Sequence, residues 1–563
     1  MDQSNDIRKT QRSFARKALA EPEHRFQDLW HLLCREDWIR TALEAVLTNK
    51  GAKTPGIDGV SKADLQTEAQ KIEFVQILQH ELKTGQFRPS PVRRAWRPKP
   101  GKTEKRPLGV LTMTDRVVQE LLRMLMEPIW ESDFLNCSNG FRPGRQTMDC
   151  IAVLYDRIQP RNKYYWVIEG DIRKCFDRIN HTNLLKLVQR RIADKRIIRL
   201  IDCFLRAGVM EDGIFHENQE GTPQGGVLSP LLSNIYLHEL DRWWWDRYGS
   251  LTRWQKTKRR REMKGNCILT RYADDFILLY NGPQEEVESL RDELREFLWN
   301  ELHLELSEEK TKITHATEGF DFLGFHVQWE TPSNSKPWLR VTPTRESEQR
   351  LRNTIKRMTN RATTWESVRQ KIRAINRILR GWGNYYRHVS SSQVRGELDW
   401  WVSQRMLIWL QKRHQKLGKR KLLAMYNIRQ GGRRMNWGAG EGKDKTFLFL
   451  LRDIKHSVYR SKKRGNPYLD DESCTIPALG AESPHLETWD GSTSRRKAEW
   501  WTIRARVLQR DGYRCLKCGA MENLEVHHVK PKGGNRMDNL ETLCNYCHVL
   551  TPSYGRNRKR QSG

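Results

Sequence analysis

The chain has 563 residues, of which 37% are hydrophobic and 30% are charged, and its 100 Lys and Arg residues outnumber 69 Asp and Glu residues to give a formal net charge of +31. This length is enough for several separate cores. The absence of a long apolar run or a signal peptide argues against an integral membrane protein. It also predicts that the chain stays in the compartment where it is made. So large a positive charge predicts nucleic acid rather than a membrane as the partner, and a surface kept soluble by charge is the alternative.

The first predicted elements are helices. Residues 25–50 have helical periodicity up to the Gly- and Pro-containing sequence KGAKTPGIDGV, and residues 63–85 have a helical pattern again. A basic, Pro-rich stretch follows, and a long region of mixed strands and helices is predicted for residues 105–330.

Two segments of the mixed region place acidic residues at strand ends. The sequence YYWVIEGDIRKCFDRIN predicts an apolar strand that ends in Asp171, and ILTRYADDFILLY predicts a strand–turn–strand hairpin with Asp274 and Asp275 at its tip. Adjacent carboxylates repel each other unless cations share them. Three carboxylates converging on Mg²⁺ suit phosphoryl transfer from a nucleoside triphosphate, so we predict a two-metal site. An Asp pair in an ordinary loop is the alternative.

Residues 345–388 are strongly basic and helical in pattern. One predicted helical face carries Ile372, Ile375, Leu379 and Trp382, and another carries an arginine row, Arg369, Arg373, Arg377 and Arg380. A helix that buries the first face and offers the second suits a phosphate backbone. A solvated surface helix is the alternative.

The C-terminal part contains a predicted linker and a small module. Residues 464–495 are rich in Gly, Pro, Ser and acids, which is typical of a linker. Beyond them lie two CxxC pairs, Cys515 with Cys518 and Cys544 with Cys547. Without an export signal this pattern indicates one structural Cys₄ zinc site rather than disulfides. The other seven cysteines are scattered and are expected to be ordinary buried thiols.

Several motifs follow one another in a characteristic order over roughly residues 25–330. They are RPLGVLTMTDRVVQELL, NGFRPGRQTMDCI, DIRKCFD, QEGTPQGGVLSPLLSNIYLHELD, YADD, LSEEKTKI and FDFLGF. Together they resemble the reverse transcriptases encoded by group II introns. The resemblance implies an α/β (α+β) right-hand polymerase fold with fingers and palm, followed by an α-helical thumb and a small ββα-metal, zinc-containing nuclease module.

The resemblance also implies domain boundaries. They are an N-terminal extension and fingers over 1–104, fingers and palm over 105–335, a thumb or maturase (X) domain over 336–440, a DNA-binding region and linker over 441–494, and an HNH endonuclease over 495–563. RILRGWGNYYRHVSS in residues 377–391 carries the resemblance to the maturase domain.

Five residues are assigned to the polymerase centre by resemblance. Asp171 and Asp274 match the principal Mg²⁺ ligands, with Asp275 in support. Phe176 matches a steric gate whose ring would clash with a 2′-hydroxyl and so select deoxynucleotides. Gln224, in PQGG, lies where the family contacts the nucleotide and the template, and the adjacent glycines allow a close backbone approach.

The remaining polymerase assignments concern the triphosphate and the primer. Lys310 matches a lysine near the triphosphate, and Lys99 and Arg106 match fingers residues that grip its oxygens. Because this loop is one residue longer than the family pattern, Lys105 is an alternative to Arg106. FLGF, residues 322–325, resembles the primer grip.

In the terminal module the sequence VHHVKPKGGNRMDNLETLCNYCH resembles an HNH nuclease. His528 matches the general base that activates water, and Asn539 matches the residue that fixes its loop. His527 and His548 match ligands of one Mg²⁺ or Mn²⁺. A zinc knuckle that only binds DNA is the alternative.

The resemblance thus implies a multifunctional intron-encoded protein that binds its intron RNA, assists splicing, cuts one strand of a DNA target and extends the new 3′ end with deoxynucleoside triphosphates. The expected location is a bacterial or archaeal cytosol, or an organelle, and the oligomeric state is left open. Two alternatives remain: a reverse transcriptase of another retroelement or a defence system, and a non-enzymatic RNA-binding splicing factor.

Overall fold

The computed structural model describes residues 3–98, 105–211, 214–217, 220–222, 225–331, 337–427, 436–440, 445–459, 465–469, 507–508, 510–512, 514–520, 524–529, 537–544 and 547. The chain forms two compact units, residues 1–481 and 482–563, which are treated separately below. Among the described helices, none combines the length and the apolar character needed to cross a membrane.

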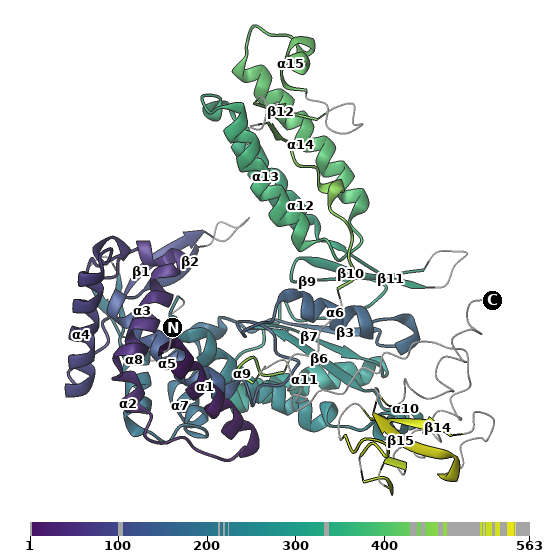
Figure 1. Ribbon diagram of the computed structural model, residues 1–563. Coiled ribbons are helices and arrows are strands. Elements are labelled where there is room, and N and C mark those ends of the chain that lie inside the picture. Colours follow the sequence, from purple (N-terminus) through teal and green to yellow (C-terminus); the bar gives the residue numbers. More distant parts are fainter. Residues whose placement is uncertain are drawn as a thin grey trace. The chain divides into compact units, whose positions relative to one another are not determined.

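The first unit is rich in α-helices (Figure 1). They are α1 (Gln3–Ala20), α2 (Trp30–Leu33), α3 (Glu36–Thr48), α4 (Glu68–Thr84), α5 (Met113–Trp130), α6 (Thr147–Arg157), α7 (His181–Gln189), α8 (Lys195–Arg206), α9 (Ser229–Trp244), α10 (Arg253–Arg261), α11 (Gln284–Leu302), α12 (Arg345–Met358), α13 (Val368–Tyr385), α14 (Ser392–Arg413) and α15 (Lys419–Tyr426).

Its strands build three sheets and a small hairpin. They are β1 (Val92–Pro98), β2 (Lys105–Val110), β3 (Trp166–Gly170), β4 (Val209–Glu211), β5 (Ile214–His216), β6 (Cys267–Tyr272), β7 (Asp275–Tyr280), β8 (Lys312–His315), β9 (Phe320–Phe322), β10 (Phe325–Glu330), β11 (Trp338–Pro343), β12 (Gly438–Ala439) and β13 (Thr446–Phe447). The mixture of helices and sheets expected for residues 105–330 is confirmed.

The N-terminal helices differ in detail from the sequence expectation. Helix α4 begins at a capping box on Thr67 and ends at Gly85, whose φ of 70° suits glycine, so the helix predicted over 63–85 is confirmed. The predicted helical segment 25–50 is two helices, α2 and α3. They are separated because Arg35 is extended, with ψ 131°, and its guanidinium bonds to Asp37 in the first turn of α3.

The first sheet has the order β2-β1-β4-β5. Strands β1 and β2 form an antiparallel hairpin in which Arg97 pairs with Arg106, and Val92 of β1 pairs in parallel with Val209 of β4. This sheet therefore joins segments that are more than a hundred residues apart.

The second sheet has the order β6-β7-β3-β8 and separates two cores. Successive side chains of a strand point to opposite faces. Ile168 and Leu278 accordingly pack in the core that includes α11, whereas Val167 and Leu279 pack in the core that includes α6. Helices α6 and α11 thus cover opposite faces of this sheet (Figure 1). Its central strands are shielded on both sides.

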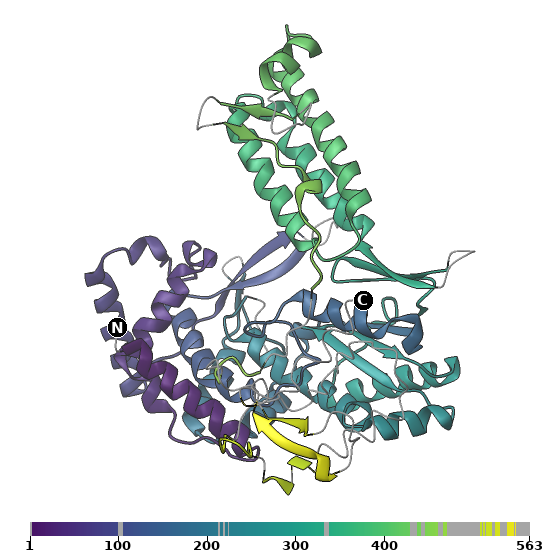
Figure 2. The same cartoon turned by 45° about the vertical axis from the view of Figure 1, so that its right-hand side comes forward.

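A third sheet leads into a helical bundle. Its order is β11-β10-β9, and after it α12, α13 and α14 lie side by side (Figure 2). The bundle core includes Ile355 of α12, Ile372 and Ile375 of α13, and Trp409 of α14. The apolar face predicted for residues 372–382 is therefore buried as expected, except that Trp382 is half-buried.

Residues 445–459 and 465–469 return along the first unit. Leu448 and Leu451 are buried in the bundle core, and the Leu451 amide donates to Asp399 Oδ1 at 2.7 Å. Further on, Tyr459 donates to Asp149 at 2.6 Å and Tyr468 donates to Glu127. The described residues of the segment 441–494, which was expected to contain a DNA-binding region and a linker, thus pack against this unit.

The described part of the second unit contains an antiparallel strand pair, β14 (Leu524–His528) and β15 (Leu540–Cys544), and a short 3₁₀ turn, Met537–Asn539. Its small core consists of Cys515, Leu543, Cys544 and Cys547.

Candidate functional site

The three predicted acids lie on neighbouring strands of the second sheet. In the antiparallel pair β3–β7, Gly170 lies opposite Phe276, so Asp171 follows one strand where Asp275 begins the other. A Cβ atom on Gly170 would lie 2.0 Å from the Phe276 ring, so glycine is required immediately before Asp171. The hairpin predicted over residues 268–280 is confirmed, with Ala273 and Asp274 between β6 and β7.

The acids influence one another electrostatically. Burial first, and then the negative charge of Asp171, raises the pKa of Asp274. Desolvation, followed by the charges of Asp274 and Asp171, raises the pKa of Asp275 to about 6, although that residue still has an exposed surface. Mutual repulsion of this kind is what a cation between carboxylates relieves. The three residues thus offer the oxygen ligands that Mg²⁺ prefers.

Lys310 occupies the position beside Asp171. Its Nζ donates to Asp171 Oδ2 at 2.7 Å, and its side chain is 58% exposed. The Ser307 amide also donates to the Asp171 carbonyl at 2.8 Å, which ties this segment to the end of β3. The positive charge of Lys310 partly offsets the effects that raise the pKa of Asp275.

The acids are less tightly gathered than a set of metal ligands. Among the described residues, only the four cysteines have ligand atoms that all lie within 4.8 Å of one another. Because carboxylates repel and Lys310 neutralises Asp171, an open arrangement is expected for the uncompensated acids. Their strand positions still bring them close enough for the charge of Asp171 to raise the pKa of both Asp274 and Asp275.

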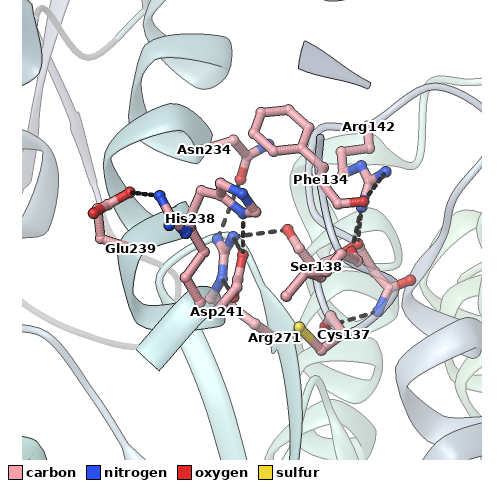
Figure 3. A network of polar contacts seen from close by, with 12 residues as sticks. Phe134, Cys137, Ser138, Arg142, Asn234, His238, Glu239, Asp241 and Arg271 are labelled. Carbon is pink, nitrogen blue, oxygen red and sulfur yellow. Dashed lines mark hydrogen bonds and ion pairs between the residues drawn. The ribbon is translucent and has the colours of Figure 1, made fainter. Parts of the chain in front are cut away.

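A buried polar network around Arg271 (Figure 3) is joined to the acid hairpin by a hydrogen bond from Arg271 to the Ala273 carbonyl. Arg271 of β6 and Asp241 of α9 are both fully buried and form a double hydrogen bond of 2.8 and 2.6 Å. A second buried pair, Arg142 with Glu131, lies nearby and is joined by bonds from Arg142 to the carbonyls of Leu135 and Ser138. The sequence analysis missed both pairs, although Arg271 is the only charged residue in the apolar run before the acids.

The predicted gate residue lies five positions after Asp171. Phe176 is half-buried in the 3₁₀ turn Cys175–Asp177, and its ring meets Phe141 edge-on, with 6.3 Å between centroids. The Thr222 amide donates to the Phe176 carbonyl at 2.7 Å, so the segment before PQGG lies against the gate. Gln224 itself falls outside the described residues.

The glycine that follows Gln224 is required by a close contact. Gly225 has a φ of 116°, and a Cβ atom there would lie 2.7 Å from the Gly109 carbonyl oxygen of β2. The close backbone approach expected for the PQGG loop is therefore to the first sheet.

Of the two alternatives on β2, Arg106 is the one whose charge reaches the acids. It lowers the pKa of both Asp274 and Asp275, and Lys105 is not among the main contributors. Arg106 and Lys105 are both exposed, and Lys99 falls outside the described residues. The structure thus favours Arg106 as the residue facing the acids.

The FLGF segment forms a turn held by the bundle. Leu323 and Gly324 have φ of 51° and 82°. Tyr385 donates to the Leu323 carbonyl at 2.8 Å, and Tyr386 donates to that of Gly324 at 3.0 Å. The end of α13 therefore positions this turn.

The arginine row lies on α13 as expected. Arg373, Arg377 and Arg380 are exposed, whereas Arg369 is half-buried. The Arg380 guanidinium lies 5.1 Å from the centroid of the Phe449 ring. Arg373 and Arg377 are therefore the members best placed to meet a phosphate backbone.

In the second unit the two CxxC pairs form one cluster. Cys518 Sγ lies 3.6 Å from Cys544 Sγ, and the Cys547 amide points at Cys544 Sγ. Burial raises the pKa of Cys515, but hydrogen bonds from backbone amides outweigh this effect and lower the pKa to about 6. The proximity of Cys518 raises the pKa of Cys547 to about 12. Four thiols this close, one stabilised as the thiolate, suit a tetrahedral zinc ion.

The predicted nuclease residues are only partly described. His527 is buried on β14, where it pairs with Glu541. The backbone of His528 pairs with Leu540, and the Asn539 carbonyl accepts from the Val529 amide at 2.9 Å. Asn539 therefore lies next to the strand end that carries His528. The side chain of His528 and all of His548 fall outside the described residues.

Three family models match separate parts of the chain. Residues 97–327 match a reverse transcriptase (RNA-dependent DNA polymerase), residues 348–426 a group II intron maturase-specific domain, and residues 514–551 an HNH endonuclease. The first match spans the acid site, the second spans α13, and the third spans the cysteine cluster.

The chain is also similar to individual curated proteins. Protein YkfC of Escherichia coli is 42% identical over 342 residues, which are 57% of this chain and 88% of that protein. The group II intron-encoded protein LtrA of Lactococcus lactis is 35% identical over 353 residues, 54% of this chain and 57% of LtrA. A 91 kDa protein in the cob intron of Schizosaccharomyces pombe is 28% identical over 572 residues, 91% of this chain and 65% of that protein.

Proposed function

The chain belongs to the group II intron-encoded proteins, which carry a reverse transcriptase domain, a maturase-specific domain and an HNH endonuclease domain, and from this premise we propose that it copies RNA into DNA at Asp171, Asp274 and Asp275. The observation that carries the proposal is the convergence of these three acids, from β3 and the β6–β7 turn, with Arg106 and Lys310 as the nearby cations.

In this proposal the first sheet belongs to the fingers, the second sheet is the palm and the helical bundle is the thumb. Asp171 and Asp274 would hold two Mg²⁺ ions, and Asp275 would support them. When bound, these ions activate the primer 3′-hydroxyl and neutralise the departing pyrophosphate. The 3′-oxygen bonds to the α-phosphorus as the bond to the β-phosphate breaks.

The other side chains position the nucleotide. Lys310, which pairs with Asp171, would bind the triphosphate with its exposed ammonium group. Arg106 and Lys99 would grip the triphosphate oxygens. The Phe176 ring would exclude a 2′-hydroxyl, and Gln224 would contact the nucleotide and the template.

The bundle would bind the intron RNA through Arg373 and Arg377, with Arg369 and Arg380 in supporting positions. Splicing chemistry would belong to the RNA, whose folding equilibrium the protein shifts by binding the active fold. In the second unit the four cysteines would hold one structural Zn²⁺. His528 would act as the general base beside Asn539, and His527 and His548 would bind Mg²⁺ or Mn²⁺.

The two enzymatic units would act in sequence. The nuclease would cut one strand of a DNA target, and the palm would extend the new 3′-hydroxyl. Because both activities share a chain, the cut end stays at a high local concentration near the polymerase.

The proposal is tested with the purified full chain on an RNA template with a DNA primer. We expect deoxynucleotide incorporation that requires Mg²⁺ and stops with a chelator, and an intron-like transcript among the RNA that co-purifies. A folded protein that binds such RNA but incorporates nothing would instead be a non-enzymatic splicing factor. Incorporation without any intron-like RNA would indicate another retroelement.

A further inference from the structure

The turn that carries Asp274 has an unusual backbone. Ala273 has a φ of 59°, a left-handed conformation that a residue with a side chain rarely adopts. Such a conformation persists only where the surrounding structure enforces it. Because Asp274 follows directly, whatever holds Ala273 also sets the direction of the carboxylate.

The Arg271 side chain holds this turn through the Ala273 carbonyl, and Figure 3 shows its other partners, Asp241, Asn234 and Ser138. Its Nη1 donates to the Ala273 carbonyl at 2.8 Å and to Asn234 Oδ1 at 3.2 Å. Its Nη2 donates to Ser138 Oγ at 2.8 Å, and Nε and Nη2 together bind the Asp241 carboxylate. A guanidinium has five N–H donors in a fixed fork, and each of them has an acceptor here.

The same network closes on the turn from the other side. Asn234 Nδ2 donates to the Gly140 carbonyl at 2.8 Å, and a Cβ atom on Gly140 would lie 2.2 Å from the Ala273 nitrogen. The turn is therefore held between the Gly140 backbone and the Arg271 guanidinium. Gly140 lies before α6, whereas Asn234 and Asp241, which hold the Arg271 side chain, lie within α9, so the network joins segments that are far apart in the sequence.

We propose that Arg271 is a positioning residue of the polymerase reaction, which, held by Asp241, fixes the Ala273 carbonyl and so aims the Asp274 carboxylate at its metal ion. The inference rests on the proposed polymerase function. A buried ion pair can also be a purely structural feature. The two roles differ in one measurable respect, because only the positioning role links Arg271 to metal affinity.

The test compares two conservative substitutions. Arg271→Lys keeps the charge opposite Asp241 but replaces the fork by a single point donor, which cannot reach the same set of acceptors. Arg142→Lys is the matched control. Arg142 forms a similarly buried pair of hydrogen bonds with Glu131 and also binds backbone carbonyls, but no described hydrogen bond joins it to residues 272–275.

Metal binding is measured directly by Mn²⁺ electron paramagnetic resonance titration of the full chain with primer and template. Deoxynucleotide incorporation is then followed across a Mg²⁺ titration. Residues that orient metal ligands typically change metal affinity by about 10–100-fold when altered. We expect Arg271→Lys to weaken Mn²⁺ binding by about 10-fold and to lower kcat, with the KM for primer–template unchanged.

Arg142→Lys is expected to lower Tm to a similar degree while its Mn²⁺ and Mg²⁺ curves overlay those of the wild type. The inference is overturned if the Arg271→Lys curves also overlay the wild type, or if Arg142→Lys shifts them equally. Should Arg271→Lys fail to fold, Asn234→Ala takes its place. That variant removes an acceptor of Arg271 and the donor to Gly140 without burying an unpaired charge. A shift of its Mn²⁺ and Mg²⁺ titration curves supports the inference, and curves that overlay those of the wild type overturn it. A wild type that incorporates no deoxynucleotide refutes the proposed function instead.

Discussion

The acid site and the cysteine cluster are both groups of candidate metal ligands, but they relate differently to the folds that carry them. Asp274 lies at the tip of a hairpin whose strands are shielded by two extensive cores, with a saturated arginine network beneath it. In the second unit, three of the four cysteines belong to the small described core itself. The first fold therefore positions its ligands, whereas the second depends on them.

This difference separates what each metal is expected to do. Removing cations from the acid site should stop chemistry and leave the first unit folded. Removing zinc from the cysteine cluster should remove the folding free energy of the second unit, because the binding free energy of a structural zinc is folding free energy.

The largest expected effect is loss of the second unit without zinc. Cys544→Ser should remove one of four ligands, so that zinc content falls, the segment from about 507 to 547 becomes sensitive to protease, and DNA cleavage is lost. Primer extension by the same preparation should be unchanged. Cys203→Ser, at a half-buried thiol of α8, is the control. Cleavage that survives in zinc-free protein would break the comparison.

The next effect separates the two enzymatic activities. His528→Ala should lower DNA strand cleavage by about 10²–10⁴-fold, the usual contribution of a general base, and leave extension of a supplied primer unaffected. A strand-specific nicking assay measures it. Cleavage at the wild-type rate would refute the assignment of the base.

A smaller effect concerns the choice of sugar. Phe176→Ala should open the space expected for a 2′-hydroxyl and lower the preference for deoxynucleotides over ribonucleotides by about 10–100-fold, within the range that pocket sterics supply. Single-nucleotide incorporation with both substrates measures this ratio. Phe141→Ala, which removes the exposed ring that meets Phe176 edge-on, should change the ratio less. Equal ratios in wild type and Phe176→Ala would show that another residue is the gate.

The smallest effect concerns the arginine row. Arg373→Glu with Arg377→Glu should weaken RNA binding and reduce the slope of log affinity against log salt by about 2, one for each lost phosphate contact. Lys195→Glu with Arg199→Glu on α8 changes the same charge at the same spacing and should have less effect. If both double variants behave alike, α13 is only a solvated basic helix.

Periodicity and local motifs predicted the parts of the molecule that depend on neighbours in sequence. The acid hairpin, the strand before Asp171 and the buried face of α13 are of this kind, because an alternating or helical pattern of apolar residues fixes which face is buried. Helix α1 was missed, although Ile7, Ala15 and Ala18 on it are buried, because its many charged residues obscure so narrow an apolar face.

The network under the acids could not be predicted, because it depends on distant segments. The role of Arg271 depends on two contacts that are distant in sequence. Asp241 of α9 pairs with its guanidinium, and the segment around Ser138 forms a β-bridge with Arg271. Likewise, the choice between Lys105 and Arg106 depends on the register of β1 and β2, which sets Arg97 opposite Arg106. Local sequence supplies the ligands, and long-range packing determines how they are held.

The central claim is that the acids of the second sheet serve chemistry rather than the stability of the fold. The most direct test is Asp274→Asn, with deoxynucleotide incorporation and Tm measured on the same preparation. Losing a metal ligand worth several kcal/mol should lower incorporation by about 10³-fold. Tm should hold or rise, because burial and the charge of Asp171 disfavour the ionised carboxyl. Incorporation close to the wild-type rate, or a collapse of Tm together with RNA binding, would contradict the account.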